Sequence, residues 1–506
     1  MAKDTAVYGV SSIVGRFLNW LLVPLYVYLF PSDEYGIVSN LYSFTAVALV
    51  ILNYGMETGF FRFANREDCD PARVYATALL SVAATSLTFM IALTLLLAPV
   101  SRALLVPQYP GYVWMLGITV AIDAFCNLPF AWLRYRNRAW RFATIKLINV
   151  GLNIGLNLLF LIFCPWAQSH CPELVNWFYA PPGGEAFGIG WIFVANIIST
   201  LCVLLCLLPE LKGRMRLSLF GSTLLGRMLH YSWPLLVLGV AGVLSQNMGQ
   251  IVMPYLFRGN ETAAHSMVGI YSANMKIALV MVMFTQAFRY AYEPFIFARA
   301  RAEGENRTSA YCDAMKFFVV FGLFIFLGVM FFLPVLRHFI SPSYWEGLGV
   351  VPVMMVAELC FGVFFNLSLW YKLTDRTAWG MYLSLLCFVL MLGLNVWLVP
   401  LIGIPGGYMG SAWAAMISYF IVMVVSWLAG RRYYPIPYPL KRMGAYCLLA
   451  AVLYAAGIWA GNALNGWISW PLRIILLTVY IGVTALYEHV PVLSPIVRKI
   501  AGRKKA

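Results

Sequence analysis

Five ionisable side chains interrupt long apolar stretches of this sequence, and they are the first candidates for chemistry. They are two bases and three acids: Arg16, Lys276, Glu57, Asp123 and Glu358. If these stretches cross a membrane, a charge at the bilayer centre costs at least about 2.5 kcal/mol, so each needs a partner or a function. Guanidinium and ammonium groups suit phosphate, whereas a buried carboxyl group can carry a coupling proton.

Each base lies on a polar helical face. Ser12, Arg16 and Asn19 recur at helical spacing in the first apolar stretch, and Ser272 lies one turn before Lys276. Such faces avoid lipid. They predict contact with a protein neighbour or with a watery cavity.

Two interpretations of the charges stay open. In the first, Arg16 and Lys276 hold an anionic substrate group, while Asp123, Glu358 and Glu57 are candidates for ion coupling. In the second, each base neutralises the acid in its own half of the chain, Asp123 or Glu358. Glu57 lies near the end of its stretch and could instead extend to the membrane surface.

A sodium site is a weaker prediction, at the polar groups of Asn247, Asn395 and Ser411. No other metal or cofactor is indicated. The ten cysteines show no paired metal-ligand spacing, and no nucleotide-binding loop is present. We therefore expect coupling to H⁺ or Na⁺, if any, and no bound cofactor.

The elements that position these residues must be membrane spans. Hydrophobic residues form 62% and charged residues 11% of the 506 residues, whereas soluble proteins carry about a quarter charged residues. A span needs about 20 apolar residues. We predict an all-α membrane protein with about 14 transmembrane helices. The predicted spans are 5–30, 36–61, 74–100, 112–133, 142–164, 188–209, 231–256, 266–290, 315–336, 348–371, 378–399, 408–430, 443–462 and 470–489.

The basic residues predict how the chain is oriented. With the N-terminus in the cytoplasm, 29 of the 35 Lys and Arg residues fall on the cytoplasmic side and four fall outside. One span more or fewer would destroy this asymmetry, so both termini are predicted to be cytoplasmic. Because the positive charge is spread over short connections, the net charge of +15 does not indicate nucleic-acid binding.

Short motifs recur in the same order in two halves of the chain. The clearest pairs are Gly36-Ile37-x-Ser39 with Gly269-Ile270-x-Ser272, and Trp132, Arg134 and Arg138 with Trp370, Lys372 and Arg376. Both halves start on the same side, so the repeat is parallel. We predict two six-helix lobes related by a pseudo-two-fold repeat, residues 1–210 and 211–432. Two C-terminal helices and a basic cytoplasmic tail follow in residues 433–506. A transported ligand would bind between the lobes.

Two motifs resemble polysaccharide-biosynthesis translocases of the multidrug/oligosaccharidyl-lipid/polysaccharide exporter superfamily. One is Phe30-Pro31-x-x-Glu34-Tyr35-Gly36-Ile37, and the other is the Gly-x-x-x-x-x-x-Ala-x-x-Ile-Ser pattern of spans six and twelve. The resemblance implies an O-antigen-type flippase for surface polysaccharide or lipopolysaccharide synthesis. Such a protein moves an undecaprenyl-pyrophosphate-linked oligosaccharide across the bacterial inner membrane by alternating access, often as an ion antiporter.

The resemblance also implies which spans line the substrate cavity. They are spans 1, 2, 7 and 8, so the pyrophosphate would meet Arg16 and Lys276. Ser12, Asn19 and Ser272 would then lie beside it.

Three alternatives stay open: a lipid II-type flippase, a cation-coupled small-molecule exporter and a membrane polysaccharide polymerase or ligase. Basic residues in the cavity would repel cationic drugs. An enzyme would need an extended polar loop, and the longest external connection, 165–187, is short of acids and histidines. We therefore expect a transporter that works as a monomer. Its expected partners are the lipid bilayer, the lipid-linked glycan and polysaccharide polymerase or assembly proteins.

Overall fold

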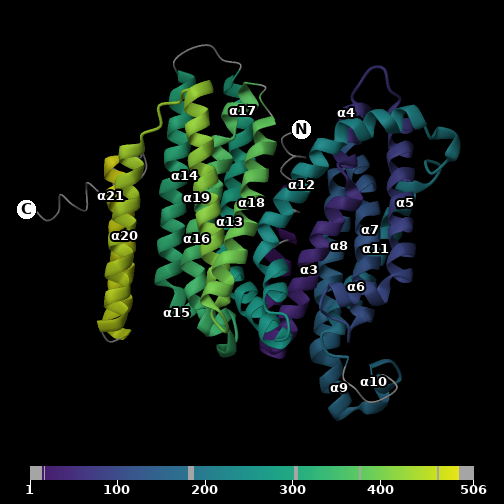
Figure 1. Ribbon diagram of the computed structural model, residues 1–506, viewed down its shortest axis with the longest axis horizontal. Coiled ribbons are helices and arrows are strands. Elements are labelled where there is room, and N and C mark those ends of the chain that lie inside the picture. Colours follow the sequence, from purple (N-terminus) through teal and green to yellow (C-terminus); the bar gives the residue numbers. More distant parts are fainter. Residues whose placement is uncertain are drawn as a thin grey trace, which may run out of the picture. The chain divides into compact units, whose positions relative to one another are not determined.

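The computed structural model describes residues 9, 14–15, 17–179, 187–300, 306–374, 376, 378–463 and 466–488. Over these residues the regular secondary structure is helical (Figure 1). Thirteen helices among the described residues are long and apolar enough to cross a membrane, and a shorter apolar helix, Phe17–Leu29, overlaps the second half of the first predicted span. Each of the other thirteen predicted spans coincides with one of these helices. The predicted all-α fold with about 14 spans is confirmed.

The chain divides by compactness into two units, Met1–Ala273 with Ser384–Ser411, and Asn274–Leu383 with Ala412–Ala506. The predicted lobes follow the repeat, whereas these units follow contacts between residues. The lobe boundaries after residues 210 and 432 therefore stay a prediction.

The first unit contains the helices of the N-terminal half and α12. Their bounds are α2 Leu22–Leu29, α3 Ser32–Asn53, α4 Met56–Ala64, α5 Pro71–Leu95, α6 Leu97–Ala103, α7 Pro110–Tyr135, α8 Ala139–Leu158, α9 Cys164–His170, α10 Pro172–Tyr179, α11 Gly190–Leu211 and α12 Ser222–Leu256. A π-helical turn, Leu159–Phe163, joins α8 to α9. Helix α7 packs against α3, α5 and α11, and α8 lies along α11 (Figure 1).

The second unit contains most helices of the C-terminal half. They are α14 Asn306–Phe331, α15 Leu333–Leu336, α16 Val350–Leu367, α17 Leu369–Leu373, α20 Leu440–Ala463 and α21 Gly466–Tyr487. Three helices contribute to both units: α13 Glu261–Ala300, α18 Ala378–Ile402 and α19 Gly407–Tyr433. Helix α14 packs against α16, α20 and α21, and α20 and α21 form an antiparallel pair (Figure 1).

Local sequence explains where individual helices begin and bend. Helix α5 begins after Asp70, whose side chain accepts a hydrogen bond from the backbone N–H of Ala72, with Pro71 in the first helical position. The second predicted span is broken between α3 and α4, where Tyr54 and Gly55 have φ of 30° and 73°. This left-handed pair ends α3, and Glu57 consequently lies in the first turn of α4.

The repeat-related tryptophans occupy similar surroundings, each within its own unit. Trp132 at the end of α7 is stacked on Tyr75, with ring centroids 4.7 Å apart. Trp370 in α17 is stacked on Tyr433, with centroids 5.6 Å apart. Both indoles are buried, at 5% and 2% exposure. The repeated motif thus anchors a helix end in an aromatic cluster in both halves of the chain.

Candidate functional site

Asp123 is part of a polar cluster inside the first unit. Asp123 is on α7, within electrostatic range of the ammonium group of Lys146 on α8 and near the hydroxyl of Thr200 on α11. Its charge also acts on Tyr42 of α3, whose hydroxyl oxygen accepts a hydrogen bond from Asn196. Four helices therefore bring an acid, a base and three neutral polar groups together. The role of Asp123 in ion coupling stays a prediction.

Lys146 was not among the predicted site residues. The charge asymmetry assigned it to the cytoplasmic side, although it falls within the predicted span 142–164. In the structure, α8 begins at Ala139, so Lys146 lies two turns inside the helix. Its neighbours Phe142, Ala143 and Ile145 are buried, and this apolar context was the signal that could have identified Lys146 as a charge within the span. Arg16, the predicted partner of Asp123 in the second interpretation, lies outside the described residues.

Glu57 forms an ion pair with Arg134, which joins α4 to the last turn of α7. The Arg134 guanidinium also lies 5.2 Å from the centroid of the Phe61 ring. Both charged side chains are more than one-third exposed, at 39% and 34%. The pair gives Glu57 a structural partner, and its role in ion coupling stays a prediction.

A buried polar contact joins α3, α12 and α13. The Asn40 amide donates to the Gln250 backbone carbonyl at 2.6 Å, and the Ser43 hydroxyl donates to the Gln250 side-chain oxygen at 2.5 Å. The Gln250 amide in turn donates to Ser272 at 3.0 Å. Ser272, a predicted cavity residue, is thus 1% exposed and part of a helix contact in this conformation.

Gly36 and Gly269, which are related by the predicted repeat, bring the backbones of α3 and α13 together. A Cβ atom on Gly36 would lie 1.8 Å from the backbone oxygen of His265, and one on Gly269 would lie 1.9 Å from that of Ser32. The hydroxyl oxygens of Ser32 and Ser266 are 2.6 Å apart beside this contact. Because the contact is reciprocal, only glycine fits at either position.

Two of the three predicted sodium ligands meet. Ser411 donates a hydrogen bond to the side-chain oxygen of Asn395 at 2.5 Å, and both residues are 1% exposed. The Asn247 amide instead donates to the Val243 backbone oxygen at 2.9 Å. Among the described residues, no three His, Cys, Asp or Glu side chains gather as metal ligands. A sodium site here stays a prediction.

The remaining predicted site residues are placed as follows. Lys276 is half-buried on α13, and Glu358 is 7% exposed on α16. The interpretation in which Glu358 neutralises Lys276 stays a prediction. Asn19 is exposed, whereas Ser12 and Arg16 lie outside the described residues.

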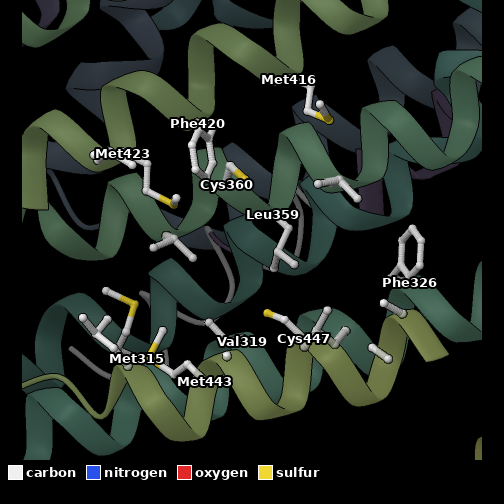
Figure 2. A pocket seen from close by; sticks show the side chains of 18 of the residues that line it. Met315, Val319, Phe326, Leu359, Cys360, Met416, Phe420, Met423, Met443 and Cys447 are labelled. Atoms are coloured by element: carbon white, nitrogen blue, oxygen red, sulfur yellow. The ribbon is translucent and has the colours of Figure 1, made fainter. Parts of the chain in front are cut away.

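An apolar cavity of about 700 Å³, open to the surface of the second unit, lies between α14, α16, α19 and α20. Figure 2 shows Cys360 and Phe420 on one side of it and Met315, Met443 and Cys447 on the other. The side chains shown there end in carbon or sulfur. Sequence analysis missed this cavity because a cavity-lining apolar face has the same pattern as a face that contacts lipid or core.

This chain is similar to known proteins in its fold rather than in its sequence. No protein-family model matches the chain, and no curated protein matches its sequence. Among solved structures, the lipid II flippase MurJ in an inward closed conformation aligns over 96% of this chain and 99% of its own, with 11% identity and a TM-score of 0.70.

Two multidrug transporters of the MATE family also share the fold. An inward-facing member of the MOP superfamily covers 82% of this chain and 93% of its own, with 15% identity and a TM-score of 0.64. The MATE multidrug transporter DinF-BH covers 86% and 97%, with 18% identity and a TM-score of 0.57. The chain therefore has the fold of these flippases and exporters.

Proposed function

We propose that this protein is a flippase that moves a polyprenyl-pyrophosphate-linked oligosaccharide across the bacterial inner membrane by alternating access. The apolar cavity of the second unit carries this proposal. An isoprenoid tail is long and apolar, and a cavity of about 700 Å³ can hold part of it. Its lining contains methionines on both sides, including Met315, Met423 and Met443, and these can adapt to a flexible chain.

Helix α20, which forms one wall of this cavity, is evidence for the class of substrate. The lining residues Met443, Cys447 and Tyr454 belong to α20, one of the two spans beyond the predicted twelve-helix repeat. Without α20 the cavity would lose one wall. Among the structures that share the fold, the lipid II flippase covers 96% of this chain, whereas the MATE transporters cover 82–86%. Both observations favour a lipid-linked substrate.

The charged groups would bind the head group of the substrate and couple its transport to an ion gradient. We assign Arg16 and Lys276 to the pyrophosphate, because arginine binds phosphate through a planar pair of N–H donors. We assign ion coupling to Asp123 first, because Lys146 lies within electrostatic range of its carboxylate and Thr200 lies near it. Glu358 is the second candidate for ion coupling.

The direct test is a flipping assay in proteoliposomes with a fluorescent polyprenyl-pyrophosphate-linked glycan. Cys447→Trp would fill the cavity, whereas Leu448→Trp, on the 67% exposed neighbouring position, is the matched control. We expect Cys447→Trp to lose flipping and Leu448→Trp to retain it. Arg16→Ala and Lys276→Ala should each slow flipping. Normal flipping by Cys447→Trp, or by both alanine variants, would contradict the respective assignments.

The second candidate is a cation-coupled exporter of small molecules, which the MATE neighbours and the Asp123 cluster favour. The same proteoliposomes distinguish the two functions. An exporter would move a cationic dye in response to an imposed pH or sodium gradient and would leave the lipid-linked glycan in place.

A further inference from the structure

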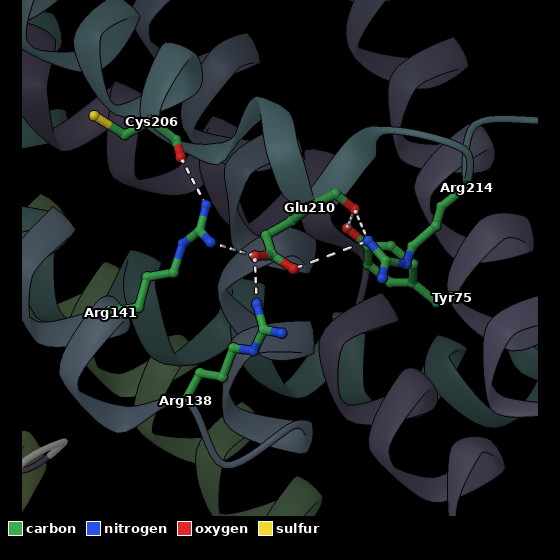
Figure 3. A network of polar contacts seen from close by, with 6 residues as sticks. All are labelled: Tyr75, Arg138, Arg141, Cys206, Glu210 and Arg214. Carbon is green, nitrogen blue, oxygen red and sulfur yellow. Dashed lines mark hydrogen bonds and ion pairs between the residues drawn. The ribbon is translucent and has the colours of Figure 1, made fainter.

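Three arginines converge on one buried carboxylate in the first unit (Figure 3). Glu210 lies in the last turn of α11, and its side chain is 4% exposed. One of its oxygens, Oε1, is 3.5 Å from Arg138 Nη1 and 3.3 Å from Arg141 Nη1, and the other is 3.9 Å from Arg214 Nη1. The arginines come from the connection after α7, the first turn of α8 and the segment after α11.

Backbone carbonyl groups hold two of these arginines in place. Arg141 donates from Nη2 to the carbonyl of Cys206 at 3.5 Å, and Arg214 donates to the carbonyl of Glu210 at 3.1 Å. The Arg214 guanidinium also lies 5.1 Å from the centroid of the Trp132 ring. The carboxylate and these contacts fix the guanidinium groups before any ligand arrives.

The cluster has positive charge and hydrogen-bond donors to spare. One carboxylate faces three guanidinium groups, and each guanidinium carries five N–H donors. The side chains of Arg138, Arg141 and Arg214 are 52%, 36% and 31% exposed, so the remaining donors are accessible. Helix α8 begins at the same place, and its N-cap residue, Arg138, makes no side-chain cap hydrogen bond. Its first N–H groups add a further preference for an anion.

Exposed apolar side chains flank the arginines along the chain. Trp140 is 69% exposed, Met215 44% and Leu217 82%. Tryptophan beside arginine is typical of the zone where lipid head groups meet acyl chains. A free phosphate ion would gain nothing from these apolar side chains, whereas a lipid would contact them.

We propose that Arg138, Arg141 and Arg214 form a binding site for the phosphate head group of a membrane lipid, and that Glu210 is its positioning residue. Two lipids offer this chemistry: a polyprenyl pyrophosphate and an anionic phospholipid. The site does not involve Asp123 or the apolar cavity, so it stands whether or not the protein is a flippase.

The experiment measures binding to the full-length protein in detergent by isothermal titration calorimetry. The probes are farnesyl pyrophosphate, dioctanoyl phosphatidylglycerol and inorganic pyrophosphate. The variants are Glu210→Gln, the pair Arg138→Ala/Arg141→Ala, and the control pair Lys212→Ala/Arg216→Ala, which removes two exposed charges from the segment after α11. Arg138→Lys/Arg141→Lys retains the charge if the alanine pair fails to fold.

A site whose arginines are held in place by Glu210 and a diffuse positive surface predict opposite results for Glu210→Gln. This variant adds one net positive charge, so diffuse attraction would tighten binding, whereas loss of positioning would weaken it. We expect Glu210→Gln to weaken binding several-fold and the arginine pair to weaken it about tenfold or more, since charge-assisted hydrogen bonds are lost. The lysine pair should also weaken binding, because it lacks the planar fork.

Three results would overturn the proposal: unchanged or tighter binding by Glu210→Gln, an equal loss in the control pair, or inorganic pyrophosphate binding as tightly as farnesyl pyrophosphate. The relative affinity of the protein for farnesyl pyrophosphate and phosphatidylglycerol shows which class of lipid supplies the phosphate head group. Tighter binding of the first identifies a polyprenyl lipid, and tighter binding of the second identifies a resident phospholipid.

Discussion

The protein pairs charged groups that it removes from water, and the ion pair between Lys316 and Glu488 is an example. Lys316 on α14 lies 2.5 Å from Glu488, just beyond α21, and their side chains are 8% and 5% exposed. Tyr446 of α20 donates a hydrogen bond to the other Glu488 oxygen. Three helices therefore meet at one ion pair. A buried pair of this kind is costly to break, because the remaining charge has no compensation.

The Lys316–Glu488 pair predicts how stability depends on pH. Burial raises the pKa of Glu488, but hydrogen bonds from Lys316 and Tyr446 outweigh it, and the pKa lies below its ordinary value. The stability from this group is complete above the unfolded-state pKa of about 4.3 and is lost as the pH falls through the lower folded-state pKa. We expect Glu488→Gln to destabilise the protein by about 3 kcal/mol at pH 7, with a smaller further loss on acidification.

Thermal unfolding in detergent between neutral and acidic pH measures this effect. Glu67→Gln, at an exposed carboxylate, is the control and should leave the profile unchanged. If Glu488→Gln had the wild-type pH profile, the ion pair would not contribute to stability.

Asp123 predicts a change in coupling rather than in substrate binding. Asp123→Asn retains the shape of the side chain but removes the charge that faces Lys146. We expect gradient-driven transport to fall to the rate seen without a gradient, while substrate binding is retained. Transport with and without an imposed proton gradient, compared with Asp123→Asn/Lys146→Gln, measures this. If transport by Asp123→Asn responded to the gradient as the wild type does, the carboxylate would have only a structural role.

At the scale of elements, the contact between α3 and α13 depends on two glycines at repeat-related positions. Gly36 and Gly269 lie where any side chain would meet the backbone of the facing helix. Small residues of this kind allow membrane helices to approach closely, because van der Waals packing rather than the hydrophobic effect drives their association. The Asn40–Gln250–Ser272 hydrogen bonds add polar contacts to the same face.

Substitution of either glycine tests this contact. Gly36→Ala and Gly269→Ala should each destabilise this conformation by about 1–3 kcal/mol, the usual cost of overpacking. The control is Gly155→Ala on α8, where a Cβ atom would have nothing within 4 Å, and it should be neutral or slightly stabilising. Thermal unfolding in detergent measures all three. Equal melting temperatures for Gly36→Ala and Gly155→Ala would show that α3 and α13 are not in close contact.

At the scale of the whole molecule, the asymmetry of positive charge predicts the orientation in the membrane. Cys171 lies in the connection that this prediction assigns to the outside, and its side chain is exposed. Arg136, also exposed, lies in a connection assigned to the cytoplasm. We expect a membrane-impermeant maleimide to label Cys171 in spheroplasts, whereas Arg136→Cys in a variant without other cysteines should react only after permeabilisation. The reverse pattern would invert the topology.

Much of the fold could be predicted from the sequence because hydropathy acts along the chain. Thirteen predicted spans coincide with helices and the first overlaps one, since a segment of about 20 apolar residues leaves water whatever its neighbours are. The candidate site was less predictable. The five charges were visible as exceptions in apolar stretches. The sequence did not show that Arg134 pairs with Glu57. It also did not show that Lys146 lies near Asp123.

The sequence by itself therefore determined which segments are helices and where charge is unusual, and it indicated that the chain repeats. Only the tertiary structure decided which side chains meet. The rotation of each helix and the choice of its neighbours bring Arg138, Arg141 and Arg214 to Glu210, and they leave a cavity between α14, α16, α19 and α20. Rotation and neighbour choice depend on packing between segments far apart in the chain, which a one-dimensional pattern of hydropathy does not record.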